Sequence, residues 1–262
     1  MNGIFALRVF LSFLVGGSFV VILIRASKLF SYRIAAAIMS TPTTVFVGLI
    51  FLTWQEGVQA TRNILPQLII FILCSVLFAY LFSFGNKHRA YRSRLLAGLL
   101  GWLVAATVAA VSTRGINIFN AVILGCLFLV GFHLLFISTF HMKSTRIKAA
   151  PEHLLYRFFA SGILMSIAVI SAKLLGSFFG FIASTLPVMY TLSLSFILKD
   201  QGVDYLHNLV CTIPKMVVSI LIFQVSLWWL LAIYDPYIAF LGAWLLSLCY
   251  AVIISRTLAP AK

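Results

Sequence analysis

The sequence predicts an all-α, polytopic membrane protein of about nine transmembrane helices, arranged as a 4+1+4 inverted-topology repeat. Three observations predict this fold: an apolar composition, nine apolar segments, and a repeat between the two halves of the chain. Of the 262 residues, 63% are hydrophobic and only 9% are charged. A soluble domain of this length needs more polar residues to cover its surface. We therefore predict helices that lie within a bilayer, where each helix satisfies its own backbone hydrogen bonds.

Charge and turn signals divide the chain into nine apolar segments, each long enough to cross a bilayer as a helix. The segments lie at about 4–24, 34–54, 65–84, 95–113, 117–140, 154–172, 177–198, 212–233 and 237–255. The four cysteines lie in or at the ends of these segments and lack metal-ligand spacing, so we predict no metal and no other cofactor.

The distribution of basic residues predicts the orientation. Lys and Arg total 19 against five acids, and positive residues in short loops stay on the cytoplasmic side. With the N-terminus outside and the C-terminus in the cytoplasm, all but Arg8, Arg62, Arg114 and Lys173 fall on the cytoplasmic side. The basic balance is thus explained by topology, and we predict no nucleic-acid partner.

A repeat joins the two halves. Residues 13–63 and 158–208, compared without gaps, are identical at ten positions, where about four are expected by chance for so biased a composition. The identities include Phe13/Phe158, Gly17/Gly162, Lys28/Lys173, Pro42/Pro187 and Gly57/Gly202. We predict a first four-helix repeat at 1–115, a linker helix at 116–142 and a second repeat at 143–262. The first four helices return the chain to its starting side of the membrane, and the linker helix then takes it across. The second repeat therefore has the opposite orientation, as in many secondary transporters.

Polar residues and a proline lie near the middle of the second and seventh segments. They are Ser40, Thr41, Pro42, Thr43 and Thr44 in the first half, and Ser184, Thr185, Pro187 and Tyr190 in the second. Corresponding prolines at mid-depth indicate broken helices around a central substrate site. The alternative is that the prolines are plain kinks, with the hydroxyls bonded to carbonyls of their own helices.

Five further residues are candidates for gating or coupling. Glu56 and Asp200 follow the two proline-bearing segments beside Gly57 and Gly202, where a glycine-centred turn with solvated charges is the alternative. Lys28 and Lys173 could attract an anionic headgroup or substrate, or simply extend to the interface from a helix end. His133 is an ionisable residue in the linker helix, and a neutral histidine bonded to a neighbouring helix is the alternative.

Other polar and small residues within the segments have a structural explanation. Gln224 is predicted to make a packing hydrogen bond between helices. Gly16, Gly17 and Gly162 are predicted to allow close helix approach rather than chemistry.

The repeat unit resembles the small four-helix GlpM-type bacterial inner-membrane proteins. The resemblance is carried by Lys173-Leu174-Leu175-Gly176, Pro187 and Gln201-Gly202-Val203, and in the first half by Lys28, Pro42 and Glu56-Gly57-Val58. It covers both halves but not the linker helix. It implies a fused, inverted tandem of that unit in the bacterial inner (plasma) membrane, and it does not imply a substrate.

The sequence favours a small secondary transporter or flippase-like protein whose central site lies between the second and seventh segments. Its expected partners are membrane lipids and a polar or anionic small-molecule or lipid substrate. Two alternatives stay open: a non-transporting subunit or assembly factor with a membrane-protein partner, and an intramembrane lipid-modifying enzyme. The sequence has no recognisable catalytic motif, and its five scattered acids cannot form the paired-aspartate magnesium motifs of a prenyltransferase, so we predict no catalytic residues.

Overall fold

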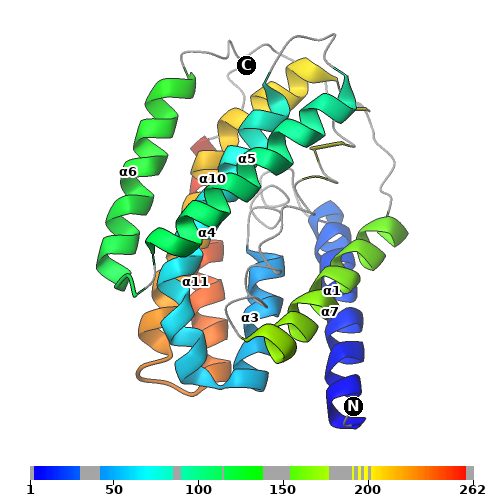
Figure 1. The fold of residues 1–262 in the computed structure, drawn as a ribbon, viewed down its shortest axis with the longest axis vertical. Coiled ribbons are helices and arrows are strands. Elements are labelled where there is room, and N and C mark those ends of the chain that lie inside the picture. The colour runs from blue at the N-terminus through cyan, green and yellow to red at the C-terminus, as the bar shows by residue number, and fades with distance from the viewer. Residues whose placement is uncertain are drawn as a thin grey trace. The chain divides into compact units, whose positions relative to one another are not determined.

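The computed structural model describes residues 3–29, 42–84, 90–113, 115–137, 154–176 and 202–257, together with positions 191, 194, 195, 198 and 199. Every long element in this part of the chain is an α-helix (Figure 1). The helices are α1 (Gly3–Leu29), α3 (Thr43–Glu56), α4 (Val58–Ser83), α5 (Tyr91–Ser112), α6 (Ile118–Ile137), α7 (Leu154–Leu175), α10 (Val203–Leu230) and α11 (Pro236–Thr257). Each overlaps one predicted apolar segment, and the segment at about 177–198 lies mostly outside the described residues.

The helices have the length and composition of membrane spans. Five are long and apolar enough to cross a bilayer: Val58–Ser83, Tyr91–Ser112, Leu154–Leu174, Ile213–Leu230 and Pro236–Ile254. Shorter apolar stretches occur at Phe5–Phe19, Val45–Glu56 and Ile118–Leu134. The predicted α-helical membrane character is therefore confirmed, whereas the count of nine spans stays a prediction.

Helix α5 illustrates why this fold needs lipid around it. Its buried side is a narrow stripe at helical spacing: Arg94, Gly98, Trp102, Ala106 and Ala109. The remaining faces carry large apolar side chains such as Leu100, Val104 and Val111, which are 59%, 63% and 66% exposed. An exposed apolar surface of this kind marks contact with another apolar phase, and in a helix of this length that phase is the bilayer.

The described chain divides into two compact units. The first comprises Met1–Leu65, His153–Leu186 and Lys215–Lys262, and the second comprises Pro66–Glu152 and Pro187–Pro214. Each unit thus takes residues from both predicted repeats. The division crosses α4 at Pro66 and α10 at Pro214, which are the prolines inside these two helices. A proline in a helix interior removes one backbone donor. The boundary between the units therefore falls, in both helices, at a position where the backbone hydrogen-bond pattern is interrupted.

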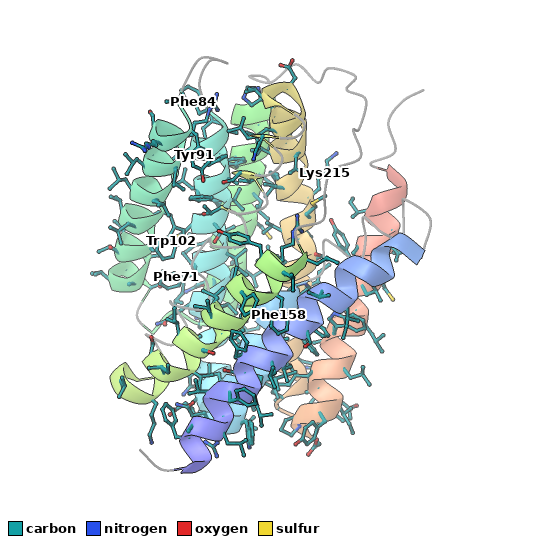
Figure 2. The ribbon with its side chains drawn as sticks, turned by 90° about the vertical axis from the view of Figure 1, so that its right-hand side faces the viewer. Phe71, Phe84, Tyr91, Trp102, Phe158 and Lys215 are labelled. Carbon is teal, nitrogen blue, oxygen red and sulfur yellow. The ribbon has the colours of Figure 1, made fainter. Side chains whose placement is uncertain are left out.

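In the first unit, α1 and α7 pack against each other in antiparallel directions. Ser166 Oγ donates to the Val9 carbonyl (3.3 Å), and Ser161 Oγ donates to the Gly16 carbonyl (3.2 Å). From the first contact to the second, the residue number rises along α1 and falls along α7, so the two helices are antiparallel. Figure 2 shows Phe158 where the two helices cross.

The glycines of this helix pair permit the close approach that the sequence predicts. A Cβ added at Gly17 would lie 2.7 Å from the Phe158 ring, and one at Gly162 would lie 2.8 Å from the Phe13 ring. In both cases the carbonyl oxygen of the same phenylalanine is also 2.8 Å away. A side chain larger than hydrogen therefore cannot be accepted at either position without moving a backbone.

In the second unit, α5 packs on α4 through its own glycines. A Cβ added at Gly98 would lie 2.8 Å from the Phe78 ring, and one at Gly101 would lie 2.0 Å from Leu81 Cδ1. On another side of α4, the Tyr80 ring makes an edge contact with Phe132 of α6 (centroids 5.5 Å apart). These contacts place α4 in the interior of the unit, which agrees with its nearly complete burial beyond Pro66.

The two glycine-centred turns have the same backbone conformation. Gly57 and Gly202 have φ of +88° and +86°, in the left-handed region where a Cβ is strained. The first helical turn after each glycine is closed by the same bond: the Thr61 N–H donates to the Gly57 carbonyl (3.3 Å), and the Leu206 N–H donates to the Gly202 carbonyl (3.2 Å). The glycine-turn interpretation of this sequence motif is therefore confirmed in both halves.

Candidate functional site

The structure describes only part of the predicted central site. Pro42 is buried and immediately precedes α3, and Thr43 and Thr44 form the first residues of that helix. The remaining predicted residues, Ser40, Thr41, Ser184, Thr185, Pro187 and Tyr190, lie outside the described residues. The predicted adjacency of the second and seventh segments therefore stays a prediction.

Helix α3 begins within the predicted second span. Pro42 is non-helical (φ −76°, ψ 58°), and its carbonyl accepts the first helical bond from the Phe46 N–H at 2.7 Å. The N-cap residue, Pro42, makes no side-chain hydrogen bond to the N-terminus of α3. The first N–H groups of a helix have no partner within the helix, and they carry the positive end of its dipole. A buried helix start in an apolar segment, whose N-cap side chain bonds none of these N–H groups, can therefore offer hydrogen-bond donors to a polar group.

Phe46, one turn into α3, is the centre of an aromatic cluster in the first unit. Its ring lies 5.7 Å from that of Phe19 on α1 and 5.9 Å from that of Phe223 on α10. It also contacts Phe240 and Trp244 on α11, at 5.9 Å and 6.3 Å. Four helices thus meet around the first turn of α3.

Polar atoms without partners lie on the helices that reach this cluster. Gln224 of α10 is fully buried, and neither its amide nitrogen nor its amide oxygen has a hydrogen-bond partner in the described part of the chain. The same holds for Trp244 Nε1 and for Ser247 Oγ on α11. The packing hydrogen bond predicted for Gln224 is not found among the described residues. Trp244 and Ser247 were not singled out by the sequence, although Ser247 is a polar residue amid apolar ones.

The candidates for gating lie at the ends of helices. Glu56 is exposed at the end of α3, where its Oε1 accepts a bond from Gln55 Nε2 at 3.1 Å. Lys173 is exposed in the last turn of α7, a position where a cation also interacts favourably with the helix dipole. Lys28 belongs to the last turn of α1, His133 is half-buried on α6, and Asp200 lies outside the described residues. These positions agree with the structural alternatives for Glu56 and Lys173 without testing a gating role.

Two basic residues on the predicted outer side are held by tryptophans. The Arg8 guanidinium lies 5.1 Å from the Trp54 ring centroid, and that of Arg62 lies 5.2 Å from the Trp228 ring centroid. Arg62 Nε also donates to the Trp228 carbonyl at 3.3 Å. Cation–π contacts of this kind stabilise a guanidinium where an apolar phase meets water, and tryptophan is enriched at that interface. They give a physical reason for two of the four exceptions to the charge rule.

The second unit contains a buried polar cluster that the sequence did not reveal. Arg94, which the charge distribution places in a cytoplasmic loop, lies in the first turn of α5 and is 1% exposed. Its Nη1 donates to the carbonyl oxygens of Ser83 (2.9 Å) and Phe82 (3.4 Å) at the end of α4. His207 Nε2 donates to the same Ser83 oxygen at 2.8 Å. Arg94 thus caps the negative end of the α4 dipole, a role that requires the tertiary structure.

Beside this cluster, Tyr91 joins α5 to a distant part of the chain. Its hydroxyl lies 3.0 Å from Ser195 Oγ, and its ring makes an edge contact with Phe82. Figure 2 shows Tyr91 and Trp102 along α5. The cluster stabilises the end of the unit through hydrogen bonds to backbone carbonyls, which is a structural role.

Comparisons with protein families, with characterised proteins and with solved structures give no match to this chain. The functional argument therefore rests on the chemistry of the residues described above.

Proposed function

We propose that this protein is a small secondary transporter or flippase-like membrane protein with a central site at the break before α3. In this proposal nine helices form two inverted four-helix repeats joined by α6. The N-terminus lies outside, the C-terminus lies in the cytoplasm, and the membrane is the bacterial inner membrane. Membrane lipids surround the protein, and the substrate is a polar or anionic small molecule or lipid headgroup.

The observation that carries the proposal is the buried start of α3 at Pro42. It lies near the middle of an apolar segment that is otherwise long enough to cross the bilayer. Discontinuous helices at this depth are how many transporters present N–H groups to a substrate, because irregular backbone is tolerated in a membrane only where protein or water satisfies it. A helix N-terminus whose N-cap residue, here Pro42, makes no side-chain hydrogen bond to it favours a ligand atom that accepts hydrogen bonds.

The contacts between α1 and α7 support the inverted repeat. Phe13 and Phe158 are equivalent in the repeat, as are Gly17 and Gly162, and each phenylalanine lies on the glycine of the other helix. Ser161, which donates to the Gly16 carbonyl, is the equivalent of Gly16 itself. Reciprocal contacts between equivalent residues are the mark of a two-fold relation, and antiparallel partners are what an axis in the membrane plane requires. The resemblance to GlpM-type proteins supports the same repeat.

Cysteine accessibility tests the central site without a known substrate. The four native cysteines are first replaced by alanine. We expect Thr43→Cys at the start of α3 to react with a small, water-soluble thiol reagent, because water reaches a transport site from at least one side. Leu100→Cys on the exposed apolar face of α5 is the control, and we expect it not to react, because lipid covers it. A Thr43→Cys protein that reacts from neither side would contradict the proposal.

A second candidate function, a non-transporting membrane subunit, is favoured by the aromatic cluster. The four rings around Phe46 pack beside the start of α3, as in a packed core. If the protein is a non-transporting subunit, we expect Thr43→Cys to stay unreactive and another membrane protein to stay bound during purification in mild detergent. A transporter would give the reactive cysteine from the protein purified alone.

A further inference from the structure

We infer that Arg8 and Arg62 are two binding positions for zwitterionic phospholipids, and that the guanidinium group of each arginine holds the phosphate of one headgroup. The inference goes beyond the proposed function, because it applies equally to a transporter and to a non-transporting subunit. It depends on three features of one end of the first unit: two oriented guanidinium groups, exposed aromatic side chains, and a balance of charges.

The two arginines belong to the same turn of the chain. The hydroxyls of Thr53 and Thr61 hydrogen-bond across the turn between α3 and α4 (2.9 Å), and these threonines are the chain neighbours of Trp54 and Arg62. The Arg8 guanidinium lies 5.1 Å from the Trp54 ring centroid, so α1 reaches this turn as well. One arm of the turn therefore carries the first arginine–tryptophan pair, and the other arm carries Arg62. All of these residues belong to the first unit.

Arg62 is oriented by two contacts with the last turn of α10. Its guanidinium lies over the Trp228 ring, 5.2 Å from the centroid, and its Nε donates to the Trp228 carbonyl at 3.3 Å. These contacts use one face of the planar group and one of its five N–H donors. The two terminal nitrogens form the fork that matches a pair of phosphate oxygens. The geometry therefore suits a ligand that arrives at the edge of the guanidinium group.

The tryptophans also lower the entropic cost of binding at both positions. A long side chain loses rotamer freedom when it takes up a ligand, and a side chain that already rests on an indole ring has less freedom to lose. Both arginines are half-buried. A phosphate bound to either one would be partly shielded from water, which strengthens the attraction between the two charges.

The exposed side chains at this end are those of a membrane interface. Four aromatic residues are exposed here: Trp54 at the end of α3, Trp229 in the last turn of α10, Tyr234 in the turn that follows, and Tyr237 in the first turn of α11. Tryptophan and tyrosine are enriched at the level of the lipid headgroups, because one end of each side chain is apolar and the other is polar. A guanidinium at that level meets lipid phosphates rather than acyl chains.

The acidic residues at this end select the kind of headgroup. Glu56, the last residue of α3, accepts a hydrogen bond from Gln55, and Asp235, just before α11, accepts one from the Tyr237 backbone N–H (2.9 Å). These contacts are with neutral groups, so both carboxylates keep their charge and balance the two arginines. A headgroup of net negative charge would be repelled by the carboxylates. Phosphatidylethanolamine offers a phosphate to the guanidinium groups and an ammonium to the acids.

Native mass spectrometry of the purified full-length protein, stripped of lipid in detergent, tests the inference. The probes are phosphatidylethanolamine, phosphatidylglycerol and diacylglycerol with the same acyl chains. We expect the protein to retain up to two molecules of phosphatidylethanolamine and no diacylglycerol, because diacylglycerol lacks the phosphate. Half occupancy with phosphatidylglycerol should need about fivefold more lipid, since one like-charge contact near the surface costs roughly 1 kcal/mol.

Variants assign each bound lipid to its arginine. Arg62→Met and Arg8→Met should each raise the phosphatidylethanolamine concentration for half occupancy of one position by about tenfold or more, because a charged hydrogen bond is lost. Arg62→Lys keeps the charge but not the fork, and should raise it by roughly fivefold. Arg92→Met is the matched control, since Arg92 is exposed on α5 in the other unit and its replacement removes the same charge. It should leave occupancy unchanged.

The headgroup preference has a variant of its own. Glu56→Gln removes one carboxylate from this end and should reduce the preference for phosphatidylethanolamine over phosphatidylglycerol. The inference is overturned if diacylglycerol is retained as well as phosphatidylethanolamine, if phosphatidylglycerol is preferred, or if Arg8→Met and Arg62→Met both behave like Arg92→Met. If Arg62→Met does not fold, Arg62→Lys and Arg8→Met decide. The reactivity of Thr43→Cys is a separate result, so failure here leaves the transport proposal standing.

Discussion

The ring of Phe158 on α7 lies directly on Gly17 of α1, and the Phe13 ring lies on Gly162 in the same way. The members of each equivalent pair are 145 residues apart in the sequence, so the contact is repeated when the two helices exchange roles. The distances agree closely: an added Cβ would be 2.7 Å from one ring and 2.8 Å from the other, and 2.8 Å from the carbonyl oxygen in both cases. One helix crossing thus contains two copies of one packing motif.

We expect Gly17→Ala and Gly162→Ala each to lower the free energy of unfolding by about 1–3 kcal/mol, the usual cost of overpacking. The new methyl group would meet a backbone oxygen, so the helices would have to separate. The two losses should be similar, because the environments are equivalent. Thermal unfolding in detergent measures them, with Gly131→Ala in α6 as the control, since a Cβ there has nothing within 4 Å. If one substitution left the free energy of unfolding unchanged and the other lowered it strongly, the result would argue against a two-fold relation.

Serines at the two ends of α5 test the orientation. Ser93 is exposed in the first turn of α5, and Ser112 is exposed at its last residue. In the protein without native cysteines, Ser93→Cys should react with a membrane-impermeant reagent only from the cytoplasmic side, and Ser112→Cys only from outside. The next turn residue with a described backbone, Gly115, is unsuitable for a cysteine because its φ of +74° disfavours any side chain. Reaction of both from one side would contradict the nine-helix arrangement.

Replacement of Pro42 tests the proposal that this proline interrupts the predicted second span before α3. Alanine restores a backbone N–H and permits helical φ and ψ at this position. We expect Pro42→Ala to insert normally and to reduce the reactivity of Thr43→Cys to that of Leu100→Cys, because the helix can then continue through position 42 and satisfy the first N–H groups of α3. Pro187→Ala should act equivalently on its own half. Pro66→Ala, in the interior of α4, is the control and should leave Thr43→Cys reactivity unchanged. An unchanged reactivity in Pro42→Ala would mean that the break has another cause.

Arg94 should be important for stability although its neighbour is not. Arg94→Met removes charged hydrogen bonds to the Ser83 and Phe82 carbonyls, and bonds to a charged group contribute about 1.5–3 kcal/mol. We expect a loss of free energy of unfolding in that range, measured by thermal unfolding. Arg92 is exposed on the same turn, and Arg92→Met should change stability by less than about 0.5 kcal/mol. Equal effects of the two variants would show that the buried bonds contribute nothing beyond net charge.

The sequence by itself determined the elements and their surroundings. Apolar segments predicted the helices because a chain in lipid must satisfy its backbone hydrogen bonds internally. Local chemistry also predicted the turns at Gly57 and Gly202, since a positive φ depends on the residue itself. The helix break predicted at Pro42 stays a prediction, because the residues before it lie outside the described part of the chain. The glycines at 16, 17 and 162 were correctly assigned to close packing. In an apolar helix, the main effect of a residue without a side chain is to let a neighbouring helix approach closely.

Only the tertiary structure decided which side chains meet. Arg94 looked like one more cytoplasmic charge, yet it is buried because the end of α4 supplies carbonyl oxygens that no local pattern reveals. Gln224 was expected to find a partner on a neighbouring helix, and its two polar atoms have none in the described part of the chain. Hydrogen bonding between helices depends on their register and rotation. Both are set by contacts such as that of Gly242 with Leu230, which join residues of two different helices and leave no trace in the spacing of either segment.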